Sequence, residues 1–556
     1  MQAEIHLGGL QTDDDWVDLV DLIRGKDQKL LENLLAEFEK AGAGGFLLEG
    51  AYIDRDFSAA YASFYSTLFE PYLKYCRRLH FFRADLSHIA AITDAEAIAY
   101  EIERQKEDYL GFIVLRPVQH APVGSAVIAA KALDEDDNVQ IDVRADHPVH
   151  VLGADLKVNG FALTQQDSRV GACAQAAIWM AGRHFYRDHG GPWFSMSDIN
   201  EAALKFTDQF VSRSIPAGSD FLRPDNMLRA LRAMDRHPVF TPADRRDLGS
   251  FADVIGRYLD SGIPVLIGLG TPGDLTAVGH AVVAIGRVMR ERGDAELPDY
   301  PTAAELISHL IVADDQRGPA CLLPVHEADR SDAYPWTLEK NGVHSITPLP
   351  NKVFMTGEAA ETISRSLVEQ CFERIEEYGA LARARADDGG EALQDAKSVD
   401  PSFYAVAPQR LVARTYLTHG WRYKGRALRN RLPDVFKYEL LSKQLPRYVW
   451  VTEYSLPDDL RGFDHCQRKV RAHVVVDATG YKHGDSNLVV QVPGVAMFTT
   501  FDANNPIATR GLIFRATNEA EPFLPKVRGW DDFDQCAVPA LPDEPGRAQP
   551  GGSEQA

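Results

Sequence analysis

The most constraining feature of the chain is the order of elements predicted between residues 251 and 319. A helix is expected first, because Val254, Ile255 and Tyr258 recur at helical spacing and Gly262 then ends the run. Three apolar segments follow, separated by polar loops: IPVLIGL, AVVAIG and HLIVA. Short apolar runs bounded by glycine and polar residues predict buried strands. This part of the chain therefore needs a mixed α+β core.

Two of these strands carry polar side chains at their ends. His280 follows Gly279 at the start of AVVAIG, where a strand fixes its direction while the ring can still reach a nucleophile. HLIVA ends in Asp314 and Asp315, and a carboxylate there can accept a hydrogen bond from the imidazole and fix its tautomer. Taken alone, each feature has a simpler interpretation, as a satisfied core histidine or as ordinary turn chemistry before Gly318.

A cysteine lies where small and polar residues give way to a helix-forming run, in QQDSRVGACAQAAIWMAG at 165–182. This places Cys173 at or near a helix N-terminus, where the macrodipole and free N–H groups favour the thiolate. A lone cysteine beside a helix is more often a small buried hydrophobe. The combination with a histidine and an acid is what indicates a nucleophile.

In chain order, the segments provide a glutamine, a cysteine that opens a helix, a histidine that opens a strand and an acid that ends the next strand. The run Gly262-Ile263-Pro264-Val265 stands between the helix and its strand. Over about residues 155–325 this pattern resembles the papain-like cysteine peptidase superfamily. Within it, the pattern is most like the branch typified by the double-glycine leader peptidases.

The resemblance implies a role for each residue of the pattern. Cys173 is the nucleophile, His280 the general base and acid, and Asp314 the acid that orients the imidazole. Gln166 joins the backbone N–H of Cys173 in the oxyanion hole. Two neighbours remain open as alternates, Gln165 for the glutamine and Asp315 for the acid.

The net charge and the spacing of the cysteines argue against several classes of protein. The 556 residues include 59 Lys and Arg against 80 Asp and Glu, a net charge of −21. Binding to nucleic acid or to an anionic membrane needs a basic surplus, so neither partner is expected. The six cysteines are far apart and form no C-x-x-C pair, which argues against a zinc knuckle or a disulfide scaffold. No export signal or long apolar stretch is visible, so a cytoplasmic location is expected.

No metal or organic cofactor is expected. Gly268-x-Gly270-x-x-Gly273 matches the dinucleotide fingerprint as a string, but no helix is predicted after it. His184 and His189 are five residues apart, which is the wrong spacing for one helical face and so for a metal pair. His465 and Cys466 have no further ligand nearby in the sequence.

The fold class predicted is α+β, with a papain-like core between two flanking regions. Helices are expected over 12–41, 57–79 and 356–385, and strands include RYVWVTEYS, KVRAHVVVDATG and NLVVQVPGVAMF. The expected domains are an N-terminal α+β region (1–150), the peptidase core (151–330), a helix and linker (331–400), a C-terminal strand-rich α+β domain (401–538) and a disordered tail (539–556).

The predicted function is a cysteine peptidase or isopeptidase that hydrolyses a peptide or protein through a thioester acyl-enzyme. A regulated effector in bacterial defence, with a regulatory partner, is one hypothesis for its biological role. The same triad would serve an acyltransferase or a transglutaminase-type enzyme. A non-catalytic binding scaffold is a further alternative. It is motivated by Ala174, where the family usually has glycine, and by Gln166, which lies one residue further from Cys173 than usual.

Overall fold

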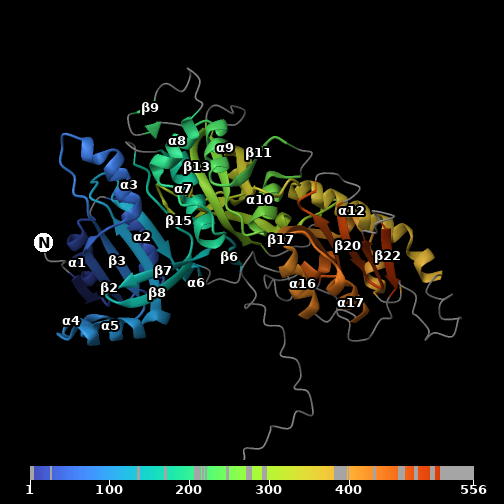
Figure 1. The fold of residues 1–556 in the computed structure, drawn as a ribbon, viewed down its shortest axis with the longest axis horizontal. Coiled ribbons are helices and arrows are strands. Elements are labelled where there is room, and N and C mark those ends of the chain that lie inside the picture. Colours follow the sequence, from blue (N-terminus) through green and yellow to red (C-terminus); the bar gives the residue numbers. More distant parts are fainter. Residues whose placement is uncertain are drawn as a thin grey trace, which may run out of the picture.

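In the computed structural model, the three largest sheets, all antiparallel, lie one after another along the long axis of the molecule (Figure 1). The mixed α+β class expected from the sequence is confirmed. The structure describes the chain except residues 1–4, 26–27, 134–137, 168–171, 206–213, 216–217, 220–221, 246–248, 271–277, 291–296, 381–396, 398–399, 430–433, 461–469, 481–485, 501–507 and 514–556.

The first sheet is an antiparallel meander in the order β1-β2-β3-β4-β5. Its strands are β1 (Ile5–Gly9), β2 (Gly45–Tyr52), β3 (Cys76–Phe82), β4 (Tyr109–Leu115) and β5 (Val123–Ile128). The amphipathic helix α2 (Lys29–Lys40) buries its apolar face on this sheet, where Phe38 stacks on Phe81 with ring centroids 4.0 Å apart. The region also contains α1 (Asp13–Ile23), α3 (Arg55–Ser63), α4 (Ser87–Ala90), α5 (Ala95–Arg104) and α6 (Ala130–Leu133).

Two helices expected in this region were wrong in extent. The helix expected over 12–41 is two helices, α1 and α2, because Arg24 adopts φ 54° and ends α1 before Gly25. The helix expected over 57–79 ends at Ser63 and is followed by a short 3-10 turn (Tyr65–Thr67). The residues from Cys76 onward instead form β3, whose side chains are almost all buried, so they carry no alternating pattern.

The central sheet carries the site residues. Its order is β11-β16-β12-β13-β14-β15, and β6 (Val139–Ile141) also pairs with β13. The strands are β11 (Arg236–Pro242), β12 (Val265–Gly270), β13 (Val278–Met289), β14 (Ile307–Asp314), β15 (Gly318–Pro324) and β16 (Gly342–Pro350). Helix α7 (Cys173–Asp188) packs on β13 and β12. Nearby elements are the hairpin β7 (Ala145–Val151) and β8 (Ala154–Gly160), and the helices α8 (Met196–Leu204), α9 (Pro224–Ala233), α10 (Phe251–Leu259) and α11 (Leu338–Asn341).

The central sheet crosses the domain boundaries expected at 150 and 330. Strand β6 comes from the region expected to be N-terminal, and β16 from the segment expected to hold only a helix and a linker. The hairpin β7–β8 also spans residue 150. The core therefore includes strands from both neighbouring regions. Most of the expected linker and all of the expected tail (539–556) lie outside the described residues.

The third sheet is a meander of six strands, with helices on both faces. The strands are β17 (Val412–His419), β18 (Tyr448–Ser455), β19 (Ala472–Asp477), β20 (Asn487–Val492), β21 (Val495–Thr500) and β22 (Ala508–Ile513). Helix α12 (Gly357–Glu373) packs between this sheet and α10. Helices α16 (Gly420–Arg429) and α17 (Asp434–Ser442) cover the other face with a separate apolar cluster. NLVVQVPGVAMF, expected as one strand, is a hairpin because Gly494 turns the chain at φ 83°.

Buried ion pairs join the central and C-terminal sheets. Asp260, at the end of α10, accepts from Arg287 of β13 (2.5 Å) and from Arg414 of β17 (2.9 Å). Arg414 also lies 3.3 Å from Glu453 of β18, and Arg287 lies 3.2 Å from Asp142. All five residues are buried, so these charges are compensated inside the protein.

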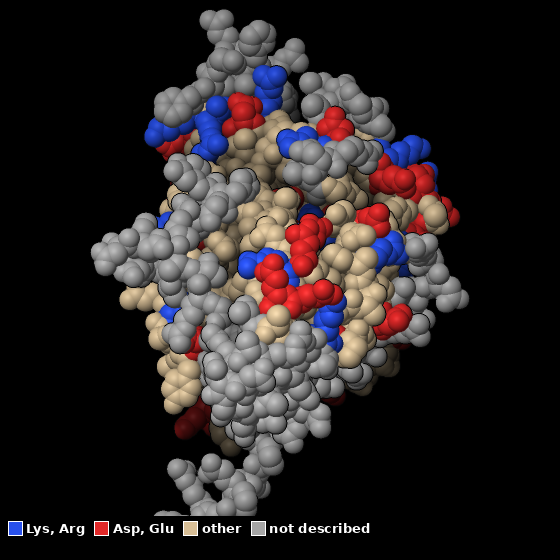
Figure 2. Space-filling view, turned by 90° about the vertical axis from the view of Figure 1, so that its right-hand side faces the viewer, with Lys and Arg blue, Asp and Glu red and all other residues tan. Residues whose placement is uncertain are grey.

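In the part of the chain that the structure describes, no helix is long and apolar enough to cross a membrane. Figure 2 looks onto the end of the molecule that faces right in Figure 1. Acidic and basic side chains are interspersed there, with several acidic ones grouped near the middle of the view.

Candidate active site

Cys173 is the first residue of α7. Ala172 precedes it in extended conformation, and its carbonyl accepts the first helical hydrogen bond from the N–H of Ala176 (3.1 Å). The side chain of Gln175 folds back and accepts from the N–H of Ala172 (3.2 Å). Since the first N–H groups of a helix have no acceptor within it, the N–H of Cys173 is available to a ligand, at the positive end of the helix dipole.

His280 lies near the start of β13, opposite Leu269 of β12, and is 2% exposed. Its Nε2 lies 3.0 Å from Oδ1 of Asp314, and its ring also interacts with the side chain of Cys173. Nδ1 is buried and makes no hydrogen bond of ordinary geometry among the described residues. Because Asp314 occupies Nε2, Nδ1 is the ring nitrogen that remains for the cysteine sulfur.

Asp314 is the last residue of β14 and is fully buried. Besides the imidazole, its carboxylate accepts hydrogen bonds from the backbone N–H of Gln316 (2.9 Å) and from the hydroxyl of Tyr334 (2.8 Å). The guanidinium of Arg317 lies 3.8 Å from its second oxygen. This set of donors holds the carboxylate in one orientation toward His280.

Electrostatics at the site favour a charged imidazole. Burial by itself lowers the pKa of His280, but the hydrogen bonds to Asp314 and Cys173 and the charges of Asp314 and Asp315 outweigh burial and raise the pKa to about 10. Burial raises the pKa of Asp314, yet the bond and charge of His280 and the donors Gln316 and Tyr334 bring it below its ordinary value. An imidazolium at neutral pH stabilises a thiolate beside it.

Asp315, the alternate acid, occupies a different position. It is fully buried, and its nearest oxygen is 3.8 Å from Nε2 of His280. Neither oxygen completes an ordinary hydrogen bond among the described residues, although the backbone N–H of Gln166 points at it. Burial, together with the negative charge of Asp314, raises the pKa of Asp315 to about 7, despite the opposing charge of His280.

The two candidate glutamines are placed differently. The side chain of Gln165 accepts a hydrogen bond from the N–H of Val123 on β5 (3.0 Å), so it serves the backbone of the N-terminal sheet. Gln166 is half-buried, and its backbone N–H lies against Asp315 beside His280. The structure thus brings Cys173, His280, Asp314, Asp315 and the backbone of Gln166 to one place, and engages the side chain of Gln165 elsewhere.

Two aromatic residues of the site were not predicted from the sequence. The ring of Trp336 lies against the imidazole of His280, with centroids 5.5 Å apart, and Tyr334 packs edge-on against Trp336 at 6.1 Å. Together they cover the imidazole–carboxylate pair. The only signal in the sequence was a pair of aromatic residues in the polar loop SDAYPW. The sequence of a loop does not predict which strand its side chains will cover.

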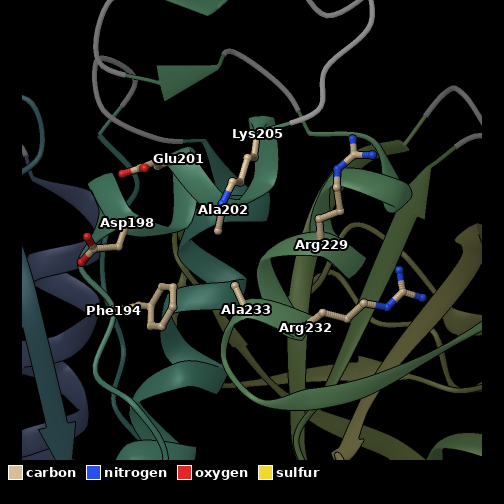
Figure 3. Close-up of a pocket in the computed structure, with 8 residues that line it drawn as sticks. All are labelled: Phe194, Asp198, Glu201, Ala202, Lys205, Arg229, Arg232 and Ala233. Carbon is tan, nitrogen blue, oxygen red and sulfur yellow. The ribbon is translucent and has the colours of Figure 1, made fainter.

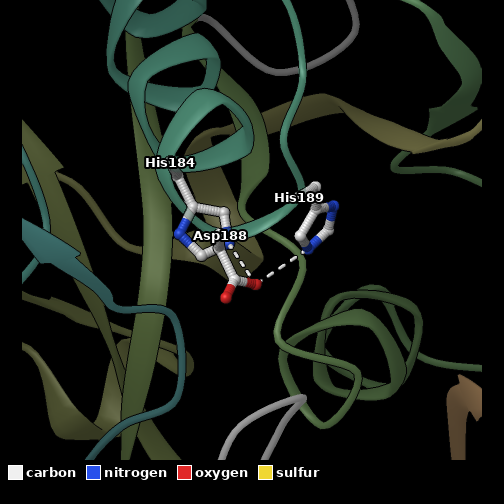
Figure 4. A group of neighbouring side chains, drawn as sticks. All are labelled: His184, Asp188 and His189. Atoms are coloured by element: carbon white, nitrogen blue, oxygen red, sulfur yellow. Dashed lines mark ion pairs between the residues drawn. The ribbon is translucent and has the colours of Figure 1, made fainter.

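The sequence spacing did not predict that His184 and His189 meet. Helix α7 ends at Asp188, so His189 leaves the helical path, and the two rings lie 5.5 Å apart beside Asp188 (Figure 4). Hydrogen-bond roles argue against a metal ion here. Nε2 of His184 faces the carbonyl of Gly262 (3.2 Å) and must carry a proton.

The tautomer of His189 leads to the same conclusion. Arg236 can only donate, so Nδ1 of His189 accepts from it (2.9 Å) and the proton lies on Nε2, 3.0 Å from Asp188. Both Nε2 lone pairs are therefore taken by protons, and the cluster ties the end of α7 to β11 and to the Gly262 turn. The group His280, Asp314 and Asp315 has the same property, because Nε2 of His280 donates its proton to Asp314.

A cleft of about 430 Å³ opens between α8 and α9, away from these residues (Figure 3). Two of its charged side chains already have structural partners. Asp198 accepts from Ser195 at the start of α8 (2.8 Å to the N–H), and Arg229 donates to Asp225 (3.0 Å) and to the carbonyl of Ala203. The cleft contains none of the predicted site residues.

The glycine string has a packing explanation. A Cβ on Gly268 would lie 2.6 Å from the ring of His344 on β16, so this glycine makes room for a buried histidine. Gly270 ends β12, and Gly273 lies outside the described residues. His465 and Cys466 also lie outside them.

No protein-family model and no curated protein matches the chain. Among solved structures, the peptidase domain of Streptococcus ComA, a bi-functional ABC transporter involved in a quorum sensing pathway, matches 34% of this chain and 96% of its own, at 13% identity and a TM-score of 0.19.

Proposed function

We propose that the chain is a cysteine peptidase or isopeptidase whose reacting group is the sulfur of Cys173. The observation that carries this proposal is the position of His280, held by a fully buried Asp314 at 3.0 Å and in contact with a cysteine at the N-terminus of α7. A base fixed by a buried carboxylate beside a partly exposed cysteine is the arrangement that nucleophilic acyl transfer requires.

The first half of the reaction is acylation. The sulfur of Cys173 attacks the carbonyl carbon of the scissile amide, and the oxygen becomes an oxyanion. The backbone N–H of Cys173 and the side chain of Gln166 are the proposed donors to that oxyanion. The imidazolium of His280 gives its Nδ1 proton to the leaving amine, the C–N bond breaks, and a thioester remains on Cys173.

The second half is deacylation. Neutral His280 takes a proton from a water molecule, which attacks the thioester carbonyl and releases the acid and the cysteine sulfur. Asp314 keeps Nε2 protonated throughout, so Nδ1 is the nitrogen that exchanges protons. The cycle needs only these side chains, the substrate and water.

Alkylation with iodoacetamide across pH 5 to 9 tests the proposal, with labelled peptides identified by mass spectrometry. Cys173 should react faster than the other cysteines and should keep its rate below the pKa of an ordinary thiol, about 8.5. The other described cysteines are internal controls, because burial raises the pKa of Cys76, Cys321 and Cys371. His280→Ala should lower the rate at pH 6 at least about tenfold.

Two results would decide against an assembled site. One is a Cys173 that follows the pH profile of a free thiol, and the other is an unchanged rate in His280→Ala. Either would favour a binding scaffold. If the thioester does form, added amine separates hydrolysis from acyl transfer. Product that grows with amine concentration and contains the amine would assign transfer in place of hydrolysis.

A further inference from the structure

The residues just before Cys173 are fastened to the N-terminal sheet. Leu163 forms a pair of backbone hydrogen bonds with Ala126 of β5 (2.8 and 2.9 Å). The hydroxyl of Thr164 donates to the carbonyl of Gly124, also on β5 (2.7 Å). Residues 163–164 thus run along the edge of this sheet as a short added strand.

Gln165 continues the attachment with three bonds. Its backbone N–H donates to the carbonyl of Val123 (3.2 Å), and its side-chain oxygen accepts from the N–H of the same residue (3.0 Å). Its own carbonyl accepts from the guanidinium of Arg116 (2.9 Å). Both partners belong to the N-terminal part of the chain.

Asp167 completes the attachment on the other side of Gln166. Its carboxylate accepts a hydrogen bond from the hydroxyl of Tyr65, which follows α3. Tyr65 and Asp167 are 2% and 4% exposed, so this bond is shielded from water. Burial and the adjacent carboxylate raise the pKa of the Tyr65 phenol, so the hydroxyl remains a donor at every working pH.

Gln166 is therefore held between two anchored neighbours. Its backbone N–H points at Asp315, which lies 3.8 Å from the imidazole of His280. A small shift of the segment would move this glutamine relative to both His280 and Cys173. Oxyanion donors lose most of their effect when displaced by about 1 Å.

We propose that Tyr65 is a positioning residue: through Asp167 it holds Gln166 in the oxyanion hole, so that the N-terminal region of the chain is part of the catalytic apparatus. This inference rests on the proposed function. It also assigns a role to a region in which the sequence showed no chemical motif.

Two reagents distinguish a defect in the oxyanion hole from a defect in the thiolate–imidazolium pair. Iodoacetamide is attacked at its methylene carbon: the C–S bond forms, iodide leaves, and no oxyanion develops. p-Nitrophenyl acetate is attacked at its carbonyl: an oxyanion forms, the C–O bond breaks, p-nitrophenolate leaves, and Cys173 becomes an acetyl thioester. The rate of alkylation depends on the sulfur of Cys173 and on His280. The rate of acylation depends on both of these and also on the oxyanion hole.

Tyr65→Phe should lower the rate of Cys173 acylation by about 10- to 100-fold. Its alkylation rate should change less than about twofold, because the thiolate–imidazolium pair stays intact. Asp167→Ala should behave like Tyr65→Phe, and Asp167→Asn, which keeps an oxygen acceptor for the phenol, should recover most of the acylation rate. Tyr61→Phe is the matched control, since it removes a hydroxyl from α3 that makes no hydrogen bond among the described residues.

A double-mutant cycle with Gln166→Ala gives the decisive comparison. If Tyr65 acts through Gln166, adding Tyr65→Phe to Gln166→Ala should lower acylation little further. Additive losses would overturn the inference, as would a Tyr65→Phe variant that acylates normally. Equal losses with both reagents would overturn it too, because the tyrosine would then only support the fold. A wild-type Cys173 no more reactive than the other cysteines would refute the proposed function, and this inference with it.

Discussion

At the scale of single residues, the pKa values of two neighbouring carboxylates in the site are shifted in opposite directions. Asp314 accepts from an imidazole, a backbone N–H and a phenol, and these donors keep its pKa below the ordinary value. Asp315 is equally buried but completes no ordinary hydrogen bond among the described residues, and its pKa rises to about 7. The same residue type one position apart therefore behaves as a fixed anion and as a group that titrates.

Replacing each acid by its amide should separate these roles. Asp314→Asn removes the main partner of the imidazolium, so alkylation of Cys173 at pH 6 should fall at least about tenfold. Asp315→Asn should have little effect at pH 5, where Asp315 is protonated and neutral. Above pH 8 Asp315 is ionised and stabilises the imidazolium, so its loss should lower the rate there. Rate profiles from pH 5 to 9 measure both, and an effect of Asp315→Asn that is largest in acid would contradict the assignment.

At the scale of secondary-structure elements, strand β12 has a glycine where the neighbouring strand β16 places a buried histidine ring. It lies between β13 and β16, and its ladder with β16 shifts register between Gly268 and Leu269. The ring of His344 occupies the space where a side chain on Gly268 would be. Burial lowers the pKa of His344 to about 4, so it is a neutral ring in this position.

Gly268→Ala should lower the free energy of unfolding by about 1–3 kcal/mol, because its methyl group must displace the buried ring. The loss should be smaller in a His344→Ala background, where the ring is absent. Gly425→Ala on α16 is the control: its methyl group would meet no atom within 4 Å, and alanine in a helix should stabilise by about 0.5–1 kcal/mol. Urea unfolding of the four variants measures these differences, and equal effects at both glycines would rule out the packing explanation.

Elements with a strong local pattern could be predicted, and those defined by distant partners could not. The apolar runs on either side of His280 and the run before Asp314 identified β12, β13 and β14, because glycine and aspartate mark their ends. Strand β16 was missed because its place depends on β11 and β12, which precede it by about a hundred and about seventy-five residues. The choice between Asp314 and Asp315 and the cover provided by Trp336 likewise depend on contacts across the fold.

At the scale of the whole molecule, the C-terminal sheet is joined to the central sheet by charge as well as by apolar packing. The largest apolar cluster extends from Leu10 to Val495, so it passes through all three sheets. Arg414 lies in the middle of this junction, between Asp260 and Glu453. The C-terminal region thus shares both an apolar cluster and buried ion pairs with the central sheet.

Arg414→Met should reduce the free energy of unfolding by about 3–5 kcal/mol, because it removes a cation that pairs with two buried carboxylates, those of Asp260 and Glu453. Arg410→Met is the matched control, since Arg410 pairs with Asp299 at the surface (3.4 Å) and such pairs contribute about 0–1 kcal/mol. Calorimetry should show one transition for all three sheets, moved to lower temperature in Arg414→Met. An unchanged midpoint, or a separate early transition already present in the wild type, would contradict this coupling.

The insertion of β16 between β11 and β12 sets an order of events on the ribosome. A nascent chain with 330 residues outside the exit tunnel already contains Cys173, His280 and Asp314, but β12 still has an open edge and β11 has no partner in the sheet. The sheet is complete only when residues 342–350, which form β16, emerge. The strands of the C-terminal sheet, β17 to β22, are translated later still. The sheet that carries His280 and Asp314 is therefore completed only after both residues have been translated.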